Sequence, residues 1–300
     1  MRIATSFLHN TTLRQMQEAQ ADMDLRTYQI TSGNKARRLQ DISNDVGRLL
    51  SLQDLKSNTD QYVKNIDTTV GRLQATEGAL QSLTDVMVEA ANLWTLARNE
   101  NSAEVRAGMA SKAQGLVESF YNIFQTKFDG RYVFSGQNGS VSPIVTSPTA
   151  NPSPVDPPPT AYYGGDPAKT QVITASGQVK DYGVTGDNLG FARMKAGLEA
   201  LWYGLQNNTT VDIDGAIDHL ENAQKDLSDM MGEVGGQMAG MNLIKNRHTD
   251  QQIFLQESVD ELDKVDVAEA MTKFTQEQAA MQASMLVLTR LQSISMLDYV

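Results

Sequence analysis

All eight prolines of this 300-residue chain lie in one window, between Pro143 and Pro167. Proline lacks a backbone N–H and interrupts both helices and central strands. We therefore expect residues 136–189 to form a separate unit, and the chain on both sides of it to form long helices. Residues 171–174 and 180–184 contain β-branched and aromatic side chains, which predicts short strands and a small β domain. A disordered linker is the alternative for this window.

The longest helical pattern lies in the last sixty residues, 241–300, which contain neither glycine nor proline. Steps of four and three residues there place side chains on one seam, as in a coiled coil. The seam positions are Val267, Met271, Phe274, Gln278, Met281, Met285 and Leu288. The pattern slips by five residues after Leu262, so we expect a boundary between residues 255 and 266.

Residues 1–40 carry a second stripe, in which apolar and polar side chains are mixed: Leu13, Met16, Gln20, Met23, Thr27 and Ile30. These forty residues contain six basic and three acidic side chains, whereas residues 250–300 contain three basic and nine acidic ones. Opposite charge on two striped ends predicts that the ends pair with each other. Two unrelated solvent-facing helices are the alternative.

Two further helical regions lie between the ends. A region from about Asp45 to Arg98 is followed by Asn101 and Glu104, a capping signal for a second helix that runs to about Phe128. Two helices joined by so short a turn form an αα-hairpin. Helical sequence resumes near Phe191, and a long seam follows at Ile217, Leu220, Gln224, Leu227, Met231, Val234, Met238, Met241 and Lys245.

These patterns predict a mainly α fold with a small inserted β domain, in which the paired N- and C-terminal regions form a long antiparallel helical bundle or coiled coil. We expect residues 1–44 with 256–300 to form a terminal coiled-coil assembly domain. Residues 45–135 with 190–255 would form a helical bundle, and residues 136–189 the β insert.

The terminal seams would gain order by burying apolar side chains against helices of the same and of neighbouring chains. We therefore predict an assembly interface at the two ends. Its candidate residues are Leu13, Met16, Met23, Ile30, Val267, Met271, Phe274, Met281, Met285, Leu288 and Leu291.

Composition and motifs argue against catalysis. The chain has no cysteine, which excludes disulfides and thiolate metal sites. Its three histidines are far apart and lack a metal-binding spacing, so we interpret them as surface or interhelical residues. Asp212, Asp214 and Asp218 with Glu221 could form a cation site. We expect them instead to precede a helix, where carboxylates complement the helix dipole. No phosphate-binding loop or nucleophile motif is present, and we predict no enzyme, no metal and no cofactor.

The formal net charge of −11 leaves no basic surface for a phosphate backbone, so we expect no nucleic-acid partner. No apolar run of eighteen residues exists, and the first ten residues lack the apolar core of a signal peptide. We therefore expect no membrane span and, if the protein is exported, a route without a cleaved signal.

Five segments, in this order, resemble the flagellin superfamily: residues 29–35, 65–83, 130–136, 234–237 and 279–300. The resemblance covers about residues 1–136 and 190–300. Within the superfamily, the Gly-Arg-Tyr-Val-Phe-Ser-Gly exit at 130–136 and the Leu-Asp-Tyr-Val ending are more similar to members that join hook and filament than to filament flagellins.

The resemblance implies a structural protein of the bacterial flagellum, exported by the type III route and located outside the cell. It implies a homo-oligomeric ring between the preceding hook-associated junction protein and flagellin. It also implies an export chaperone on the C-terminal helix before assembly. A filament-forming flagellin is the alternative within the superfamily, and a signalling coiled coil is an alternative from another class.

Overall fold

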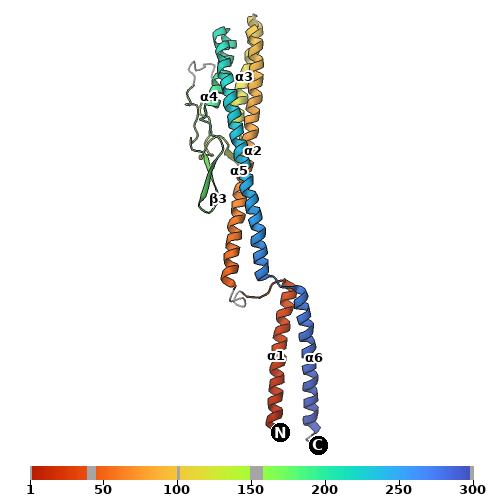
Figure 1. Cartoon of the computed structure of the whole chain (residues 1–300). Helices are drawn as coiled ribbons and strands as arrows, with labels where there is room; N and C mark the ends of the chain where they lie inside the picture. The colour runs from red at the N-terminus through yellow and green to blue at the C-terminus, as the bar shows by residue number, and fades with distance from the viewer. Residues whose placement is uncertain (1, 39–44, 100–101, 149–157, 298–300) are drawn as a thin grey trace. The chain divides into compact units, whose positions relative to one another are not determined.

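The computed structural model describes residues 2–38, 45–99, 102–148 and 158–297 (Figure 1). Its helices are α1 (Arg2–Ser32), α2 (Val46–Asn99), α3 (Ala103–Phe124), α4 (Leu189–Asn207), α5 (Thr210–Asp263) and α6 (Val267–Leu297). Four short strands lie between α3 and α4. The predicted mainly α fold with a small β insertion is confirmed.

The chain divides into two compact units, residues 1–58 with 250–300 and residues 59–249. The division falls inside α2 and inside α5, so both long helices contribute to both units. The three domains expected from the sequence stay a prediction.

The core of the second unit is built from four helices. On α5, side chains seven residues apart are buried, as a coiled-coil repeat requires: Ile213, Leu220, Leu227, Val234 and Met241. On α2, Ile66, Leu73 and Leu80 repeat the same step and are fully buried. Large side chains of α3 and α4 complete this core, among them Phe120, Phe124, Phe191, Met194 and Leu198.

Local signals set the ends of these helices. Ser102 is the N-cap of α3, and its hydroxyl accepts a hydrogen bond from the Val105 N–H at 3.5 Å. The predicted cap, Asn101, lies outside the described residues. Asn208 ends α4 in the left-handed conformation, with φ of 56°. After it, α5 begins at Thr210, seven residues before the Ile217 that opens the predicted seam.

Two hairpins lie between α3 and α4, and the second of them belongs to the predicted insert. Strands β1 (Lys127–Phe128) and β2 (Arg131–Tyr132) pair around Asp129 and Gly130, which both have positive φ, as a tight hairpin turn requires. Strands β3 (Thr170–Ala175) and β4 (Gln178–Tyr182) pair antiparallel with an irregularity between Ile173 and Ala175. The strands predicted at 171–174 and 180–184 are confirmed as this second hairpin.

An aromatic cluster anchors the insert to the helices. Phe134, just after β2, stacks on Phe124 of α3 with ring centroids 5.2 Å apart, and Phe191 of α4 meets both rings edge-on. All three side chains are fully buried. Aromatic pairs of this kind stabilise beyond the area that they bury. Tyr162 of the insert lies against Phe124, with ring centroids 6.0 Å apart, so the insert is packed into the same core as the helices.

Candidate functional site

In the first unit, α1 and α6 lie side by side and antiparallel, with the two chain ends together (Figure 1). Arg26 of α1 reaches Glu277 of α6, with Nε 3.3 Å from Oε1, and both side chains are about one-fifth exposed. The predicted pairing of the terminal regions is confirmed within this unit. The charge difference between the ends provides one of its cross-helix contacts.

At one end of this pair, the segment that follows α1 is hydrogen-bonded to the segment between α5 and α6. The Lys35 N–H donates to Asp263 O at 2.7 Å, and the Val265 N–H donates to Gly33 O at 3.0 Å. Gly33 has φ of 72°, which favours glycine, and it ends α1 where the sequence predicts a break. The break between α5 and α6 lies within the predicted boundary at 255–266. The two backbone bonds fix the register of the pair.

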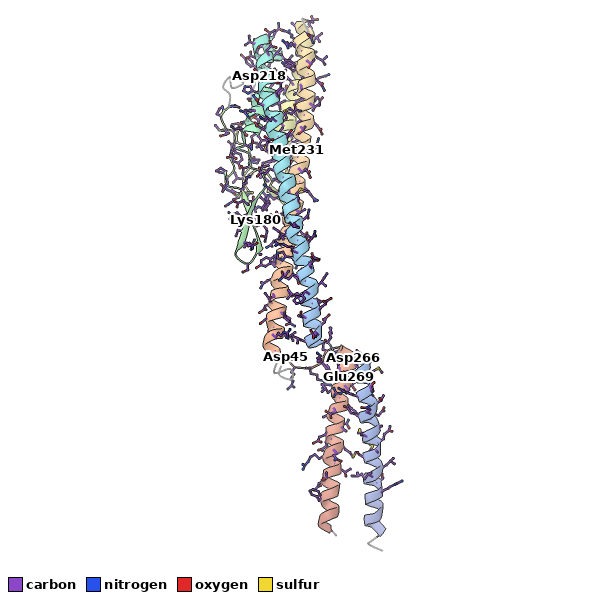
Figure 2. The ribbon with its side chains drawn as sticks, in the orientation of Figure 1. Asp45, Lys180, Asp218, Met231, Asp266 and Glu269 are labelled. Carbon is purple, nitrogen blue, oxygen red and sulfur yellow. The ribbon has the colours of Figure 1, made fainter. Side chains whose placement is uncertain are left out.

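Asp266 begins α6 as its cap. Its Oδ1 accepts from the N–H groups of Ala268 and Glu269, at 2.9 and 3.1 Å, and Figure 2 shows Asp266 and Glu269 together at this end of the helix. Carboxylates in the first turn also complement the helix dipole. These acidic side chains therefore have a local structural role.

The structure places the predicted interface residues in two groups. Six of them are half-buried between α1 and α6: Met16, Met23, Ile30, Phe274, Met281 and Leu288. Four are exposed, namely Leu13, Val267, Met271 and Met285, at 38%, 42%, 53% and 44% of their surface. The eleventh, Leu291, belongs to α6, but its side chain lies outside the described residues.

The other contact positions between α1 and α6 each lie one residue before a seam position expected from the sequence. Thr12 and Ala270 are buried, and the other members of this set are half-buried: Ala19, Arg26, Glu277 and Ser284. These side chains are small or charged, so the spacing of large apolar residues in the sequence does not predict that they lie in the contact. In the structure, these positions alternate with the half-buried apolar ones in steps of four and three residues, which shows that they belong to the same seam.

Six exposed residues each lie three positions before a half-buried seam residue of their own helix. They are Leu13, Gln20 and Thr27 on α1, and Met271, Gln278 and Met285 on α6. In an antiparallel pair, positions with the same offset fall on the same side of the two helices. We call these six residues the uncharged flank. Coiled-coil positions beside the seam are usually charged.

Three of the six flank residues, Leu13, Met271 and Met285, are apolar, and they widen the apolar stripe of their helices beyond a two-helix seam. A stripe of three positions in seven is typical of helices that pack against more than one neighbour. All six flank residues are exposed in the single chain. This side of the α1–α6 pair is therefore open to solvent in the single chain, and none of these six positions is charged.

The described residues contain no cluster of three or more His, Cys, Asp or Glu side chains that could hold a metal ion. His219 and His248 are buried, and the His248 ring nitrogen Nε2 lies 2.7 Å from Thr174 O. The third, His9, lies outside the described side chains. Asp214 pairs with Arg98 at 3.6 Å. Among the described helices, none combines the length and the hydropathy that a membrane crossing needs.

Buried phenols hold the insert in place. The Tyr162 hydroxyl donates to Gly186 O at 2.7 Å within the insert. The Tyr121 hydroxyl of α3 lies 3.2 Å from Ser147 O of the insert and 3.2 Å from Glu199 Oε1 of α4. Burial raises the pKa of both phenols well above the usual range. They therefore stay protonated as donors and serve structure.

Two sequence models match this chain. The bacterial flagellin N-terminal helical region matches residues 3–139, and the bacterial flagellin C-terminal helical region matches residues 217–300. Together they cover most of the chain outside the insert and α4.

Relatives match along the whole length. Flagellar hook-associated protein 3 of Salmonella typhimurium is 21% identical over 324 aligned positions, which cover 99% of this chain and 98% of the relative. The protein of the same name from Escherichia coli K12 is 20% identical with the same coverage. A crystal structure of Bacillus cereus FlgL has a TM-score of 0.58 at 18% identity, covering 70% of this chain and 98% of that one, and so shares the fold.

Proposed function

This chain belongs to the flagellin family, and on that premise we propose that it is a hook–filament junction subunit of the bacterial flagellum, like hook-associated protein 3. The observation that carries the proposal is the match over 99% of this chain and 98% of a relative with that name. The protein would be a structural adaptor that polymerises between the preceding hook-associated protein and flagellin.

Assembly would use the uncharged flank of the α1–α6 pair. The pair buries little by itself, and helices of neighbouring copies would cover Leu13, Met271 and Met285, which are exposed in the single chain. Apolar area removed from water contributes about 25 cal/mol per Å². Copies joined in this way would form the homo-oligomeric ring.

Export before assembly would expose α6 to a chaperone. Its exposed apolar residues include Leu286, on the side away from the seam, at 65% exposure, and Val287, directly before the half-buried Leu288, at 49%. An amphipathic helix of this kind suits a helix-in-groove partner. We place the assembled protein outside the cell, after export by the flagellar type III route without a cleaved signal.

A strain that lacks this gene tests the junction role. We expect intact hooks, no attached filaments and flagellin spilled into the medium, all restored by the wild-type gene. Flagellin in the medium is measured by immunoblot and hooks by electron microscopy. Normal filaments on the deletion strain would contradict the proposal, and long filaments formed by the purified chain alone would favour a filament flagellin.

A further inference from the structure

Four glycines lie within nine residues of α5: Gly232, Gly235, Gly236 and Gly240. Glycine is the poorest helix former after proline, because the unfolded chain gains the most freedom there. Apart from the neighbouring residues and the backbone of the same helix, a Cβ added at any of the four would meet no atom within 4 Å. Crowding within the chain therefore does not explain these glycines, and their effect in this unit is to weaken the helix.

The opposite side of the same stretch is packed. Met230, Val234 and Met241 are buried in the core of the second unit. These contacts hold the helix on one face. They do not compensate for the backbone freedom of the glycines on the other face.

The β3–β4 hairpin, on which Figure 2 labels Lys180, is joined to this weak stretch at two places. At the open end of the hairpin, Lys169 forms an ion pair with Glu233, and the Gly183 N–H donates to Gln237 Oε1 at 2.7 Å. Gln237 Nε2 donates to Glu233 Oε1 at 2.9 Å. The residues just before β3 and just after β4 are thus tied to one turn of α5.

Nearer the tip of the hairpin, His248 Nε2 lies 2.7 Å from Thr174 O. His248 is fifteen residues after Glu233, about 22 Å along a helix at 1.5 Å per residue. Gly235, Gly236 and Gly240 fall between these attachment points. The Tyr62 ring of α2 packs on His248, with centroids 5.6 Å apart, and secures this second attachment.

We propose that the β3–β4 hairpin braces α5, keeping it helical across residues 232–240. Glu233 and Gln237 are neighbours only while the segment is helical, because side chains four residues apart meet on one helix face. The bonds to Lys169 and Gly183 therefore stabilise the helical form selectively. When the brace is released, α5 bends or unwinds at the glycines.

Hydrogen exchange of the full-length protein, measured by mass spectrometry, tests the brace. The variant carries Lys169→Ala and Gln237→Ala, which remove both bonds at the open end of the hairpin. We expect the amides of residues 232–240 to exchange about tenfold faster, while the rest of α5 is unchanged. Adding Gly235→Ala and Gly236→Ala to this variant should restore the slow exchange.

Asp226→Asn is the matched control, because it removes the Arg193–Asp226 ion pair at 2.7 Å, on α5 but outside the glycine stretch. It should leave exchange at 232–240 as in the wild type. Should the double variant not fold, Gly235→Ala with Gly236→Ala in the wild type should slow exchange at the same amides. Unchanged exchange in these variants, or a uniform rise along α5, overturns the brace.

Discussion

At the scale of the residue, the buried carboxylate of Glu199 shows what a sequence does not reveal. Glu199 is 2% exposed and accepts from Lys195 Nζ at 2.7 Å, four residues earlier on α4. Its contact with the Tyr121 hydroxyl joins residues 78 positions apart. Since nothing local marks a charge that will be buried, this group was not predicted from the sequence.

We predict that Lys195→Met destabilises the second unit by about 2 kcal/mol, because it removes the cation that lies 2.7 Å from a buried carboxylate. Both tryptophans, Trp94 and Trp202, belong to this unit, so fluorescence during urea unfolding reports its stability.

The matched control for this change is Lys245→Met. It removes an ion pair with Asp67 of 2.6 Å whose side chains are 37% and 50% exposed. Exposed pairs contribute less than about 1 kcal/mol, so the midpoint should move little. Equal shifts for the two variants would contradict a special role for the buried pair.

At the scale of the element, half of each helical seam was predictable. On α5, Leu220, Leu227, Val234 and Met241 are buried as expected. The alternate positions, expected at Ile217 and Gln224, are instead Ala216 and Ala223, which are fully buried. The same shift by one residue recurs in α1 and α6.

Most of the side chains at the shifted positions are small, and the others, Arg26 and Glu277, are charged. Alanine, serine and threonine let two helix backbones approach closely, yet they carry little hydrophobic signal. The larger Ile217 is displaced to the edge of the seam, where it is half-buried. The pattern of large apolar residues therefore predicted the helices and their pairing correctly. The contact face that it predicted is rotated about the helix axis relative to the one observed.

The uncharged flank yields a prediction for α6. Met271→Asp with Met285→Asp should leave a folded, soluble chain, since both side chains are exposed, and should abolish incorporation into flagella. Placing two charges in a buried helix contact is strongly unfavourable. Circular dichroism measures the fold, and complementation of the deletion strain measures incorporation.

Thr272→Asp with Ala279→Asp provides the control on the same helix, because neither residue belongs to the apolar set offered to the chaperone. Both residues are exposed and lie away from the seam and from the flank. The control variant should support motility better than the flank variant. If the two variants behave alike, or if the flank variant loses its helix content, the assignment of the interface to this flank is wrong.

At the scale of the whole molecule, the two units differ in how much they bury. Among the described side chains of α1 and α6, only Thr12, Gln29 and Ala270 are buried. The second unit has a continuous core that runs from α2 through the insert to α5. A two-helix pair with so few buried groups is marginal in water, because helices gain most of their stability from packing.

We therefore predict that heating unfolds the chain in two steps. The first should lower the helical circular dichroism signal at 222 nm without changing tryptophan fluorescence, because both tryptophans lie in the second unit. The second should change both signals together. A single transition, reported equally by circular dichroism and fluorescence, would show that the α1–α6 pair is as stable as the second unit. The two-step result fits a terminal pair that becomes stable when neighbouring copies cover its uncharged flank.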